Sequence, residues 1–428
     1  MRLTDGYGYV VTQAAKKGSV MFLCRRYARS LRFRHATNLL ALTIGFAACA
    51  SSWGAAPPSQ DNALDAALHA DLNDYLSTRS TIEHISTLSM NVSFRGDPEH
   101  IKIAVGTTQY GGGDKVTPSN LFQIGSNTKA FTSTIILKLE AAGLLSIDDT
   151  LGKWLPQYPA WKDVTIRHLL DMTSGIPTYD STPAQEAQYA NNPYETYTPE
   201  QLVAFVYPTI KTPAIWEYSN TGYILAQMII DEASPSHSYQ TELDHLFAEN
   251  HLKNTFYEPN FYPAAVTRRL VSGYWVNTGD PGLEKLLGMD TKDFSLGWTQ
   301  AAGGIIATPD DLTTWVRDLF EGDVLPSKQK AELESLVAIP SGQPIEKTSA
   351  DQTEAFGLGV FQITAPPLGL FWGYQGSTLG YRAIYSYLPD SGLIITVFTN
   401  SQAAPKVSLV NTVLINKLYE TLKSFGKI

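Results

Sequence analysis

The sequence is poor in the residues that build disulfides and metal sites. It has two cysteines in 428 residues, Cys24 and Cys49, and both lie in the first fifty positions. We therefore expect no internal disulfide in the globular part of the chain. The eight histidines are scattered, and no Cys-rich or His-x-x-x-His pattern occurs. This argues against a zinc site, and we expect a protein that needs no metal and no cofactor.

Positive charge is sparse as well. The net charge is −9, and no basic face is evident beyond the first forty residues. This balance argues against nucleic acid as the main partner. We expect a small-molecule or peptide substrate. Internal repeats and low-complexity tracts are also lacking. A chain of 428 residues can bury a large core and suggests two or three structural units.

The N-terminal fifty residues resemble an export signal. Five arginines between 25 and 34 precede the apolar run 38–48, which is too short to span a bilayer comfortably, and Ala48-Cys49-Ala50 offers a small-residue cleavage site. We assign 1–50 to this signal, with 1–20 as an upstream extension if Met21 is the true start. The expected location is periplasmic or secreted. Phe46-Ala47-Ala48-Cys49 also resembles a lipoprotein box, so a membrane lipid anchor at Cys49 stays open as the alternative.

The remaining chain predicts an α+β protein. After a linker at 51–62, residues 63–76 have helical apolar spacing, and 85–95 and 101–107 alternate as half-buried strands do. Helices are expected at 164–172, 199–206, 221–231 and 309–320, with Thr308 as the N-cap of the last, and 178–197 is expected to be a long surface loop. Strands at 357–361, 381–388 and 393–399 precede a final helix at 406–423. We expect one catalytic domain at 63–424. Its antiparallel sheet comes from 63–122 and 355–424, so the termini lie close together, and helices flank the sheet while a mainly helical part spans 123–354.

One short stretch carries candidate chemistry. Ser126 follows Gly125 at the start of an expected helix that runs to about Leu145, and Lys129 lies one turn further on the same face. A serine with a lysine at this spacing is a compact nucleophile and base, and a helix N-terminus offers free N–H groups for an anion. Taken alone, Ser126 is more simply a helix cap, because Ser-x-x-Lys is frequent by chance.

Three other stretches have both a functional and a purely structural interpretation. Tyr218 and Asn220 are two apart before an expected helix, and a tyrosine beside a lysine is a candidate proton shuttle. Gly376, near a strand, lets a backbone approach a ligand, or marks a bulge. The stretch 297–304, which contains Trp298, is a pocket wall or a buried turn. A Ser-His-Asp triad is disfavoured because no Gly-x-Ser-x-Gly occurs, and His168 is expected to cap or pack its helix.

These motifs together resemble the serine β-lactamase and penicillin-binding protein superfamily, in particular the branch of class C β-lactamases, Streptomyces-type D-Ala-D-Ala carboxypeptidases, D-aminopeptidases and related esterases. The resemblance covers about residues 100–400. The matching stretches are Leu121 to Thr132, Gly143 to Asp149, Thr165 to Leu170, Thr173-Ser174-Gly175, Tyr218 to Tyr223 and Ala302 to Thr308.

The resemblance implies a β-lactamase/transpeptidase-like fold and an acyl-enzyme mechanism. It assigns Ser126 as nucleophile, Lys129 as proton acceptor and Tyr218 as relay. Asn220 would bind the substrate amide or Lys129. The oxyanion hole would be the backbone N–H groups of Ser126 and Ser377. Trp298 and Gly376 are further candidate substrate-binding residues.

The chain departs from the family at the third motif. Tyr374-Gln375-Gly376 stands where the family has Lys-Thr-Gly, His-Thr-Gly or a His-x-Gly variant. We expect Tyr374 to donate one hydrogen bond to the substrate and Gln375 to offer an amide, with no charge from either. Arg382 is the nearest cation, and strand alternation argues against its pointing into the cleft.

The expected activity is an exported serine hydrolase, best matched to a D-alanyl-D-alanine carboxypeptidase acting on cell-wall peptides. An esterase or a class C-like β-lactamase is the alternative. A non-catalytic penicillin-binding-like sensor of wall fragments is kept as the non-enzyme alternative, because the third motif is altered. The same alteration weakens the case for β-lactamase activity, and to a lesser extent that for carboxypeptidase activity.

Overall fold

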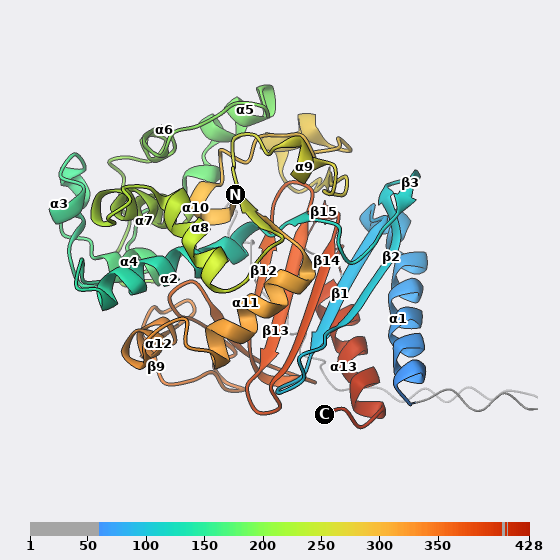
Figure 1. Ribbon diagram of the computed structural model, residues 1–428. Helices are drawn as coiled ribbons and strands as arrows, with labels where there is room; N and C mark the ends of the chain where they lie inside the picture. The colour runs from blue at the N-terminus through green and yellow to red at the C-terminus, as the bar shows by residue number, and fades with distance from the viewer. Residues whose placement is uncertain (1–59, 405–406, 409) are drawn as a thin grey trace, which may run out of the picture. The chain divides into compact units, whose positions relative to one another are not determined.

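The computed structural model describes residues 60–404, 407–408 and 410–428, and residues 59–428 form one compact unit (Figure 1). The expected export signal and the anchor site at Cys49 lie outside the described residues. Among the helices that are described, none combines the length and apolar character that a membrane span requires.

A ten-stranded antiparallel sheet forms the core of this unit. Its order is β3-β2-β1-β14-β13-β12-β11-β10-β8-β9, so strands from both ends of the chain meet at the β1–β14 pair, with Leu88 opposite Thr399. The expected α+β class and the joining of the two ends are confirmed. The strands are β1 Thr87–Ser93, β2 Ile101–Gln109, β3 Gly112–Lys115, β8 Leu336–Ala338, β9 Pro344–Ile345, β10 Glu354–Phe356, β11 Phe361–Ala365, β12 Gly369–Ser377, β13 Arg382–Leu388 and β14 Leu393–Thr399.

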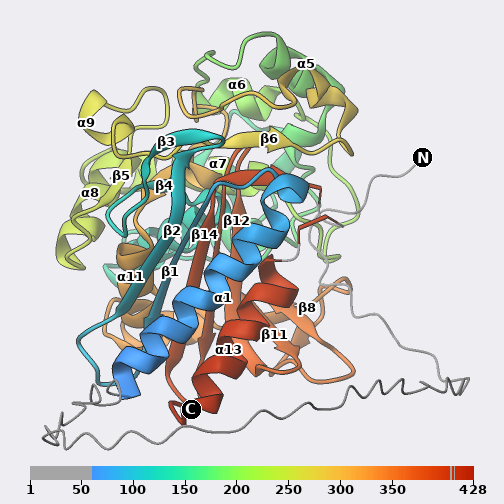
Figure 2. The same ribbon diagram turned by 90° about the vertical axis from the view of Figure 1, so that its right-hand side faces the viewer.

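Two terminal helices cover one face of this sheet. Figure 2 shows α1 (Gln60–Glu83) beside α13 (Ile415–Ser424), and a π-helical turn, η5 (Val410–Leu414), precedes α13. Lys427 Nζ lies 3.0 Å from Asp61 Oδ1, so the two ends of the described chain meet as expected.

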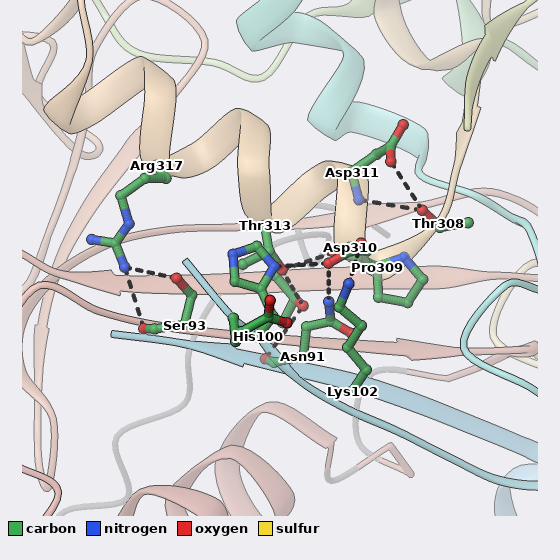
Figure 3. A network of polar contacts seen from close by, with 12 residues as sticks. Asn91, Ser93, His100, Lys102, Thr308, Pro309, Asp310, Asp311, Thr313 and Arg317 are labelled. Atoms are coloured by element: carbon green, nitrogen blue, oxygen red, sulfur yellow. Dashed lines mark hydrogen bonds and ion pairs between the residues drawn. The ribbon is translucent and has the colours of Figure 1, made fainter. Parts of the chain in front are cut away.

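Helix α11 (Pro309–Glu321) crosses the other face, and side chains at its start fix it there (Figure 3). The Thr308 hydroxyl accepts from the backbone N–H of Asp311 at 3.2 Å, which is the expected N-cap. The carboxylate of Asp310 accepts from Asn91 of β1 at 2.9 Å and from Lys102 of β2 at 2.7 Å. These contacts hold the helical part of the molecule over the terminal strands.

The helical part also contains two small sheets. One pairs β4 (Phe122–Gln123), β7 (Ile305–Ala307) and β5 (Thr255–Tyr257), and the other pairs β15 (Ser401–Ala403) with β6 (Tyr274–Val276). The remaining helices are α2 Thr128–Ala141, α3 Leu151–Trp154, α4 Ile166–Leu170, α5 Pro183–Asn191, α6 Pro199–Ala204, α7 Asn220–Ala233, α8 Tyr239–Glu249, α9 Ala264–Thr267, α10 Gln300–Gly303 and α12 Ser327–Leu333, with 3₁₀ turns η1 Gly125–Asn127, η2 Pro159–Trp161, η3 Tyr179–Ser181 and η4 Pro281–Leu286.

Three sequence expectations are wrong in detail. The expected loop 178–197 contains helix α5, which Thr182 caps and Pro183 begins, a start signal hidden by the polar composition. Residues 357–360 are not a strand but connect β10 to β11. Strands β8, β9 and β10 belong to the main sheet although they begin before residue 355, so the sheet extends further into the middle of the chain than expected.

Candidate active site

The site lies where the start of α2 meets the end of strand β12. Ser126 sits in the 3₁₀ turn η1 that leads into α2 and is 6% exposed, while Lys129, one turn on, is fully buried. The Ser126 side chain does not cap the helix, because its Oγ faces the side chains of Lys129 and Tyr218. The simpler interpretation of Ser126 as a cap therefore fails.

Ser126 is held between two proton-carrying groups. Its Oγ lies 3.1 Å from Lys129 Nζ and 2.7 Å from the Tyr218 hydroxyl. Lys129 Nζ also donates to Asn220 Oδ1 at 2.6 Å and to the carbonyl of Ala302 at 2.7 Å. The structure thus brings together the serine, lysine, tyrosine and asparagine singled out in the sequence.

The electrostatics of Lys129 suit a base. Burial lowers the pKa of Lys129 from 10.5 to about 7, and the negative charge of Asp180 opposes this shift. The lowered pKa leaves a large fraction of the amine neutral near pH 7. A neutral amine 3.1 Å from Ser126 Oγ can accept the serine proton.

The register of the hairpin β12–β13 turns the backbone N–H of Ser377 away from β13. Thr378 N donates to the carbonyl of Tyr381 at 3.1 Å, so the next pair, Ser377 and Arg382, is a non-hydrogen-bonded pair of the ladder. The N–H of Ser377 is therefore turned away from β13, at a position beyond the end of β11. The 3₁₀ turn η1, whose own first N–H groups include that of Ser126, packs against β12.

Two glycines allow this close approach. A Cβ on Gly376 would lie 1.9 Å from the carbonyl oxygen of Ile124, and one on Gly125, whose φ is +51°, would lie 2.5 Å from the nitrogen of Ser377. Both distances are much shorter than any that a real Cβ atom makes. The strand and the turn can approach each other in this way only because both residues lack a side chain.

The structure corrects two residue assignments made from the sequence, which placed Tyr374 and Gln375 at the substrate surface. Tyr374 is 1% exposed and its hydroxyl lies 3.3 Å from that of Tyr218, so it lies behind the relay and not at the substrate surface. Gln375, one position on, projects from the opposite face of β12 because strand side chains alternate. Its amide donates to Ser377 Oγ at 3.3 Å and accepts from Asn411.

Trp298 and Arg382 have different surroundings. The half-buried ring of Trp298 packs on Tyr189 of α5 with centroids 5.3 Å apart, and its carbonyl accepts from Tyr179. Arg382 is buried on the α1 face of the sheet, where it donates to the carbonyl of Ala403 and pairs with Glu83 at 3.9 Å. It supplies no charge to the Ser126 side, as strand alternation indicated.

Two contributors were missed by sequence reasoning. Asp180 accepts from Asn220 Nδ2 at 2.6 Å, and Thr178 Oγ1 accepts from the backbone N–H of Asn220 at 3.1 Å. Both lie in the stretch expected to be an open loop, and no spacing pattern in the sequence distinguishes them. The carbonyl of Ala302 lies in the stretch flagged as a pocket wall, but a backbone acceptor carries no residue signature. Within the described residues, no group of three or more His, Cys, Asp or Glu side chains is placed to hold a metal ion.

This fold and this arrangement of Ser126, Lys129 and Tyr218 are those of the serine β-lactamase and penicillin-binding superfamily of hydrolases. A family model described as Beta-lactamase matches residues 79–419, and the chain belongs to that family. The superfamily resemblance and the β-lactamase/transpeptidase-like fold expected from the sequence are confirmed.

Comparisons with curated relatives agree. Penicillin-binding protein 4* of Bacillus subtilis (strain 168) is 26% identical over 291 residues, which cover 66% of this chain and 61% of that protein. Protein flp of Staphylococcus aureus (strain MW2) is 25% identical over 328 residues, which cover 72% and 59%. The alignments thus span about three-fifths of the length of these two relatives.

Solved structures share the fold. A D-stereospecific amidohydrolase from Streptomyces sp. superimposes with a TM-score of 0.66 at 25% identity, over 81% of this chain and 98% of that one. The D-amino acid amidase from Ochrobactrum anthropi SV3 gives a TM-score of 0.70 at 23% identity, over 85% and 99%.

Proposed function

We propose that this chain is a serine hydrolase that acts through an acyl-enzyme on Ser126, with D-alanyl-D-alanine peptides of the cell-wall type as substrate in a carboxypeptidase-like reaction. The observation that carries the proposal is the position of Ser126 Oγ between Lys129 Nζ at 3.1 Å and the Tyr218 hydroxyl at 2.7 Å. A nucleophile in contact with both a buried amine and a phenol has the groups for every proton transfer that amide hydrolysis needs.

Acylation follows from these contacts. Ser126 Oγ attacks the substrate carbonyl while its proton passes to Lys129, and the carbonyl oxygen becomes an anion facing the N–H groups of Ser126 and Ser377. Tyr218 donates its proton to the leaving nitrogen, the C–N bond breaks, and the ammonium of Lys129 returns a proton to the Tyr218 oxygen. A water molecule then repeats the sequence on the ester, which releases the acid and frees Ser126. One such oxyanion donor contributes about 3 kcal/mol to lowering the barrier.

A second candidate substrate class is an amide or ester of a D-amino acid that has no terminal carboxylate. It is supported by the uncharged side chains of Tyr374 and Gln375 and by the placement of Arg382 on the other face of the sheet. The solved amidohydrolase and amidase that share the fold are named for D-stereospecific or D-amino-acid substrates. A β-lactam is a third candidate.

Two measurements test the proposal. Incubation with a fluorophosphonate and with a labelled penicillin, followed by peptide mass spectrometry, should find an adduct on Ser126 that Ser126→Ala lacks. If neither probe gives an adduct on Ser126, the hydrolase hypothesis is wrong and the wall-fragment sensor is the alternative that stands. Rates on a D-Ala-D-Ala peptide, its C-terminal amide, a p-nitrophenyl ester and a chromogenic cephalosporin then identify the substrate class.

Export remains part of the proposal, with or without a lipid anchor at Cys49. The mass of the mature N-terminus distinguishes the two forms, because a lipidated Cys49 adds acyl mass and a secreted form does not. A mature protein that retains residue 30 would contradict both.

A further inference from the structure

Tyr374 is the buried partner of the catalytic tyrosine. It lies on β12, and its hydroxyl is 3.3 Å from that of Tyr218, which in turn is 2.7 Å from Ser126 Oγ. The three hydroxyls thus form a chain of two contacts that starts at buried Tyr374 and ends at the nucleophile. Lys129 is not a member of this chain.

Two phenylalanines pack edge-on against the ring of Tyr374. The centroid of Phe361 lies 4.9 Å from that of Tyr374, and the centroid of Phe356 lies 6.3 Å away. With 1% of its surface exposed, the residue is not accessible to a bound substrate without a rearrangement of β12. It reaches the reacting atoms through Tyr218.

We propose that Tyr374 is a positioning residue for Tyr218 and that its hydroxyl donates to the Tyr218 oxygen during the proton transfer to the leaving group. This inference rests on the proposed function of Ser126 and Tyr218. A donor on the Tyr218 oxygen directs the proton of Tyr218 toward Ser126 and the leaving atom. When that proton has gone, the same donor stabilises the negative oxygen that is left. A hydrogen bond to a charged group is stronger than one between neutral groups, so the contact favours the transition state over the ground state.

The dependence on the leaving group provides the test. Amide nitrogen must be protonated to depart, whereas p-nitrophenolate departs as a stable anion and needs no proton from Tyr218. We expect Tyr374→Phe to lower kcat/KM for a D-alanyl p-nitroanilide by about 10-fold or more. For the p-nitrophenyl ester with the same acyl group we expect a change of less than about 2-fold, because the missing contact acts only on the proton transfer.

Tyr387→Phe is the matched control. Tyr387 lies on the neighbouring strand β13, is 4% exposed and donates to Glu321 Oε1 at 2.9 Å, at a position remote from Ser126. The Tyr387→Phe substitution removes a buried hydroxyl from the same sheet and should leave the ratio of anilide to ester rates unchanged. A loss of both activities in equal proportion in Tyr374→Phe, or the same ratio change in Tyr387→Phe, would overturn the proposal in favour of a packing effect.

A double-mutant cycle identifies the residue through which Tyr374 acts. In a Tyr218→Phe background, Tyr374→Phe should have no further effect on the rate of Ser126 acylation by the anilide. An equal loss in both backgrounds contradicts the inference. Failure of the wild-type chain to form any Ser126 adduct would instead refute the proposed function, so the two failures are distinguishable.

Discussion

The carboxylate of Asp180 accepts a hydrogen bond from the amide of Asn220 at 2.6 Å and thereby fixes which end of that amide meets Lys129. With Nδ2 bound to Asp180, the oxygen of Asn220 faces Lys129 Nζ, also at 2.6 Å. Asp180 thus acts on the base in two ways: it orients the acceptor of the amine, and its charge raises the pKa that burial lowers. Asp180, one of the two contributors that sequence patterns missed, thus opposes the effect of burial on the pKa of the base.

We predict that Asp180→Asn shifts the acidic limb of the pH profile. Lys129 must be neutral to accept the serine proton, so kcat/KM should rise with pH through its pKa of about 7. Removing the negative charge leaves burial unopposed and lowers that pKa further, so the limb should move to lower pH. Asp148→Asn, whose carboxylate is 70% exposed and pairs with Arg167, is the control and should leave the limb in place. A shift of the Asp180→Asn limb to higher pH would contradict this account.

Burial of Lys129 also predicts how stability depends on pH. Its pKa in the folded state is about 7 and its ordinary value is 10.5, so between these pH values the unfolded chain binds more protons than the folded one. Stability from this group therefore increases as the pH rises from about 7 to about 10. Relative to Lys129→Met, the wild type should gain on the order of 4 kcal/mol across that range.

Urea denaturation of both proteins at several pH values measures this gain. Titrations elsewhere in the chain cancel in the difference. Lys138→Met, at a lysine with a 37% exposed side chain, is the surface control. A wild-type advantage over Lys129→Met that stays flat from pH 7 to pH 10 would mean that the amine is not desolvated in the folded state.

The nucleophile and its nearest partners could be predicted from the sequence because they lie in short local motifs. Ser126 and Lys129 are one helical turn apart, and Tyr218 and Asn220 are two residues apart at the start of α7. Residues that are so close in the sequence remain close in space in the folded chain. That these two pairs lie close together across the cleft was inferred from the family resemblance, since no local pattern relates residue 126 to residue 218.

The roles of Tyr374, Gln375 and Asp180 depend on long-range packing that no local pattern encodes. The register of a strand decides which of its residues face the cleft. Ser377 is paired with Arg382, which lies on the α1 face, so Gln375, two residues before Ser377, lies on the α1 face as well. Position in the third motif suggested that Tyr374 and Gln375 both contact substrate, yet alternation separates them. Asp180 lies in η3, the turn before α5, in a stretch without apolar period, so its approach to Asn220 is visible only in three dimensions.

Gly376→Ala should separate the strand from the nucleophile. The new Cβ would meet the backbone oxygen of Ile124 at 1.9 Å, and backbone atoms cannot move aside as the end of a flexible side chain can. We expect β12 to shift, which carries the N–H of Ser377 away from Ser126 and lowers kcat by roughly 100-fold or more. Gly112→Ala on β3, where an added Cβ meets nothing within 4 Å, should keep wild-type kcat. A Gly376→Ala enzyme with wild-type kcat would contradict the assignment of the Ser377 N–H to the oxyanion hole.

The ion pair behind the same hairpin should be important for stability. Arg382 is 2% exposed, Glu83 is fully buried, and the two are 3.9 Å apart, while Glu83 Oε1 also accepts from Tyr75 at 2.7 Å and from Arg79 at 2.8 Å. Replacing Glu83 with Gln leaves the guanidinium of Arg382 in the core without its counter-charge. A buried charge deprived of its partner typically destabilises a protein by about 3–5 kcal/mol.

Chemical denaturation of Glu83→Gln should therefore show a clear loss, with a lower midpoint and an unchanged m-value. The exposed pair of Lys138 with Glu249 provides the comparison, because Glu249→Gln removes a surface ion pair and should change stability by less than about 1 kcal/mol. If Glu83→Gln were as mild as Glu249→Gln, the charge of Arg382 would have to be balanced by its contact with the carbonyl of Ala403 and by the dipoles around it. The β12–β13 hairpin would then be held by packing, and the position of Ser377 would not depend on charge behind the sheet.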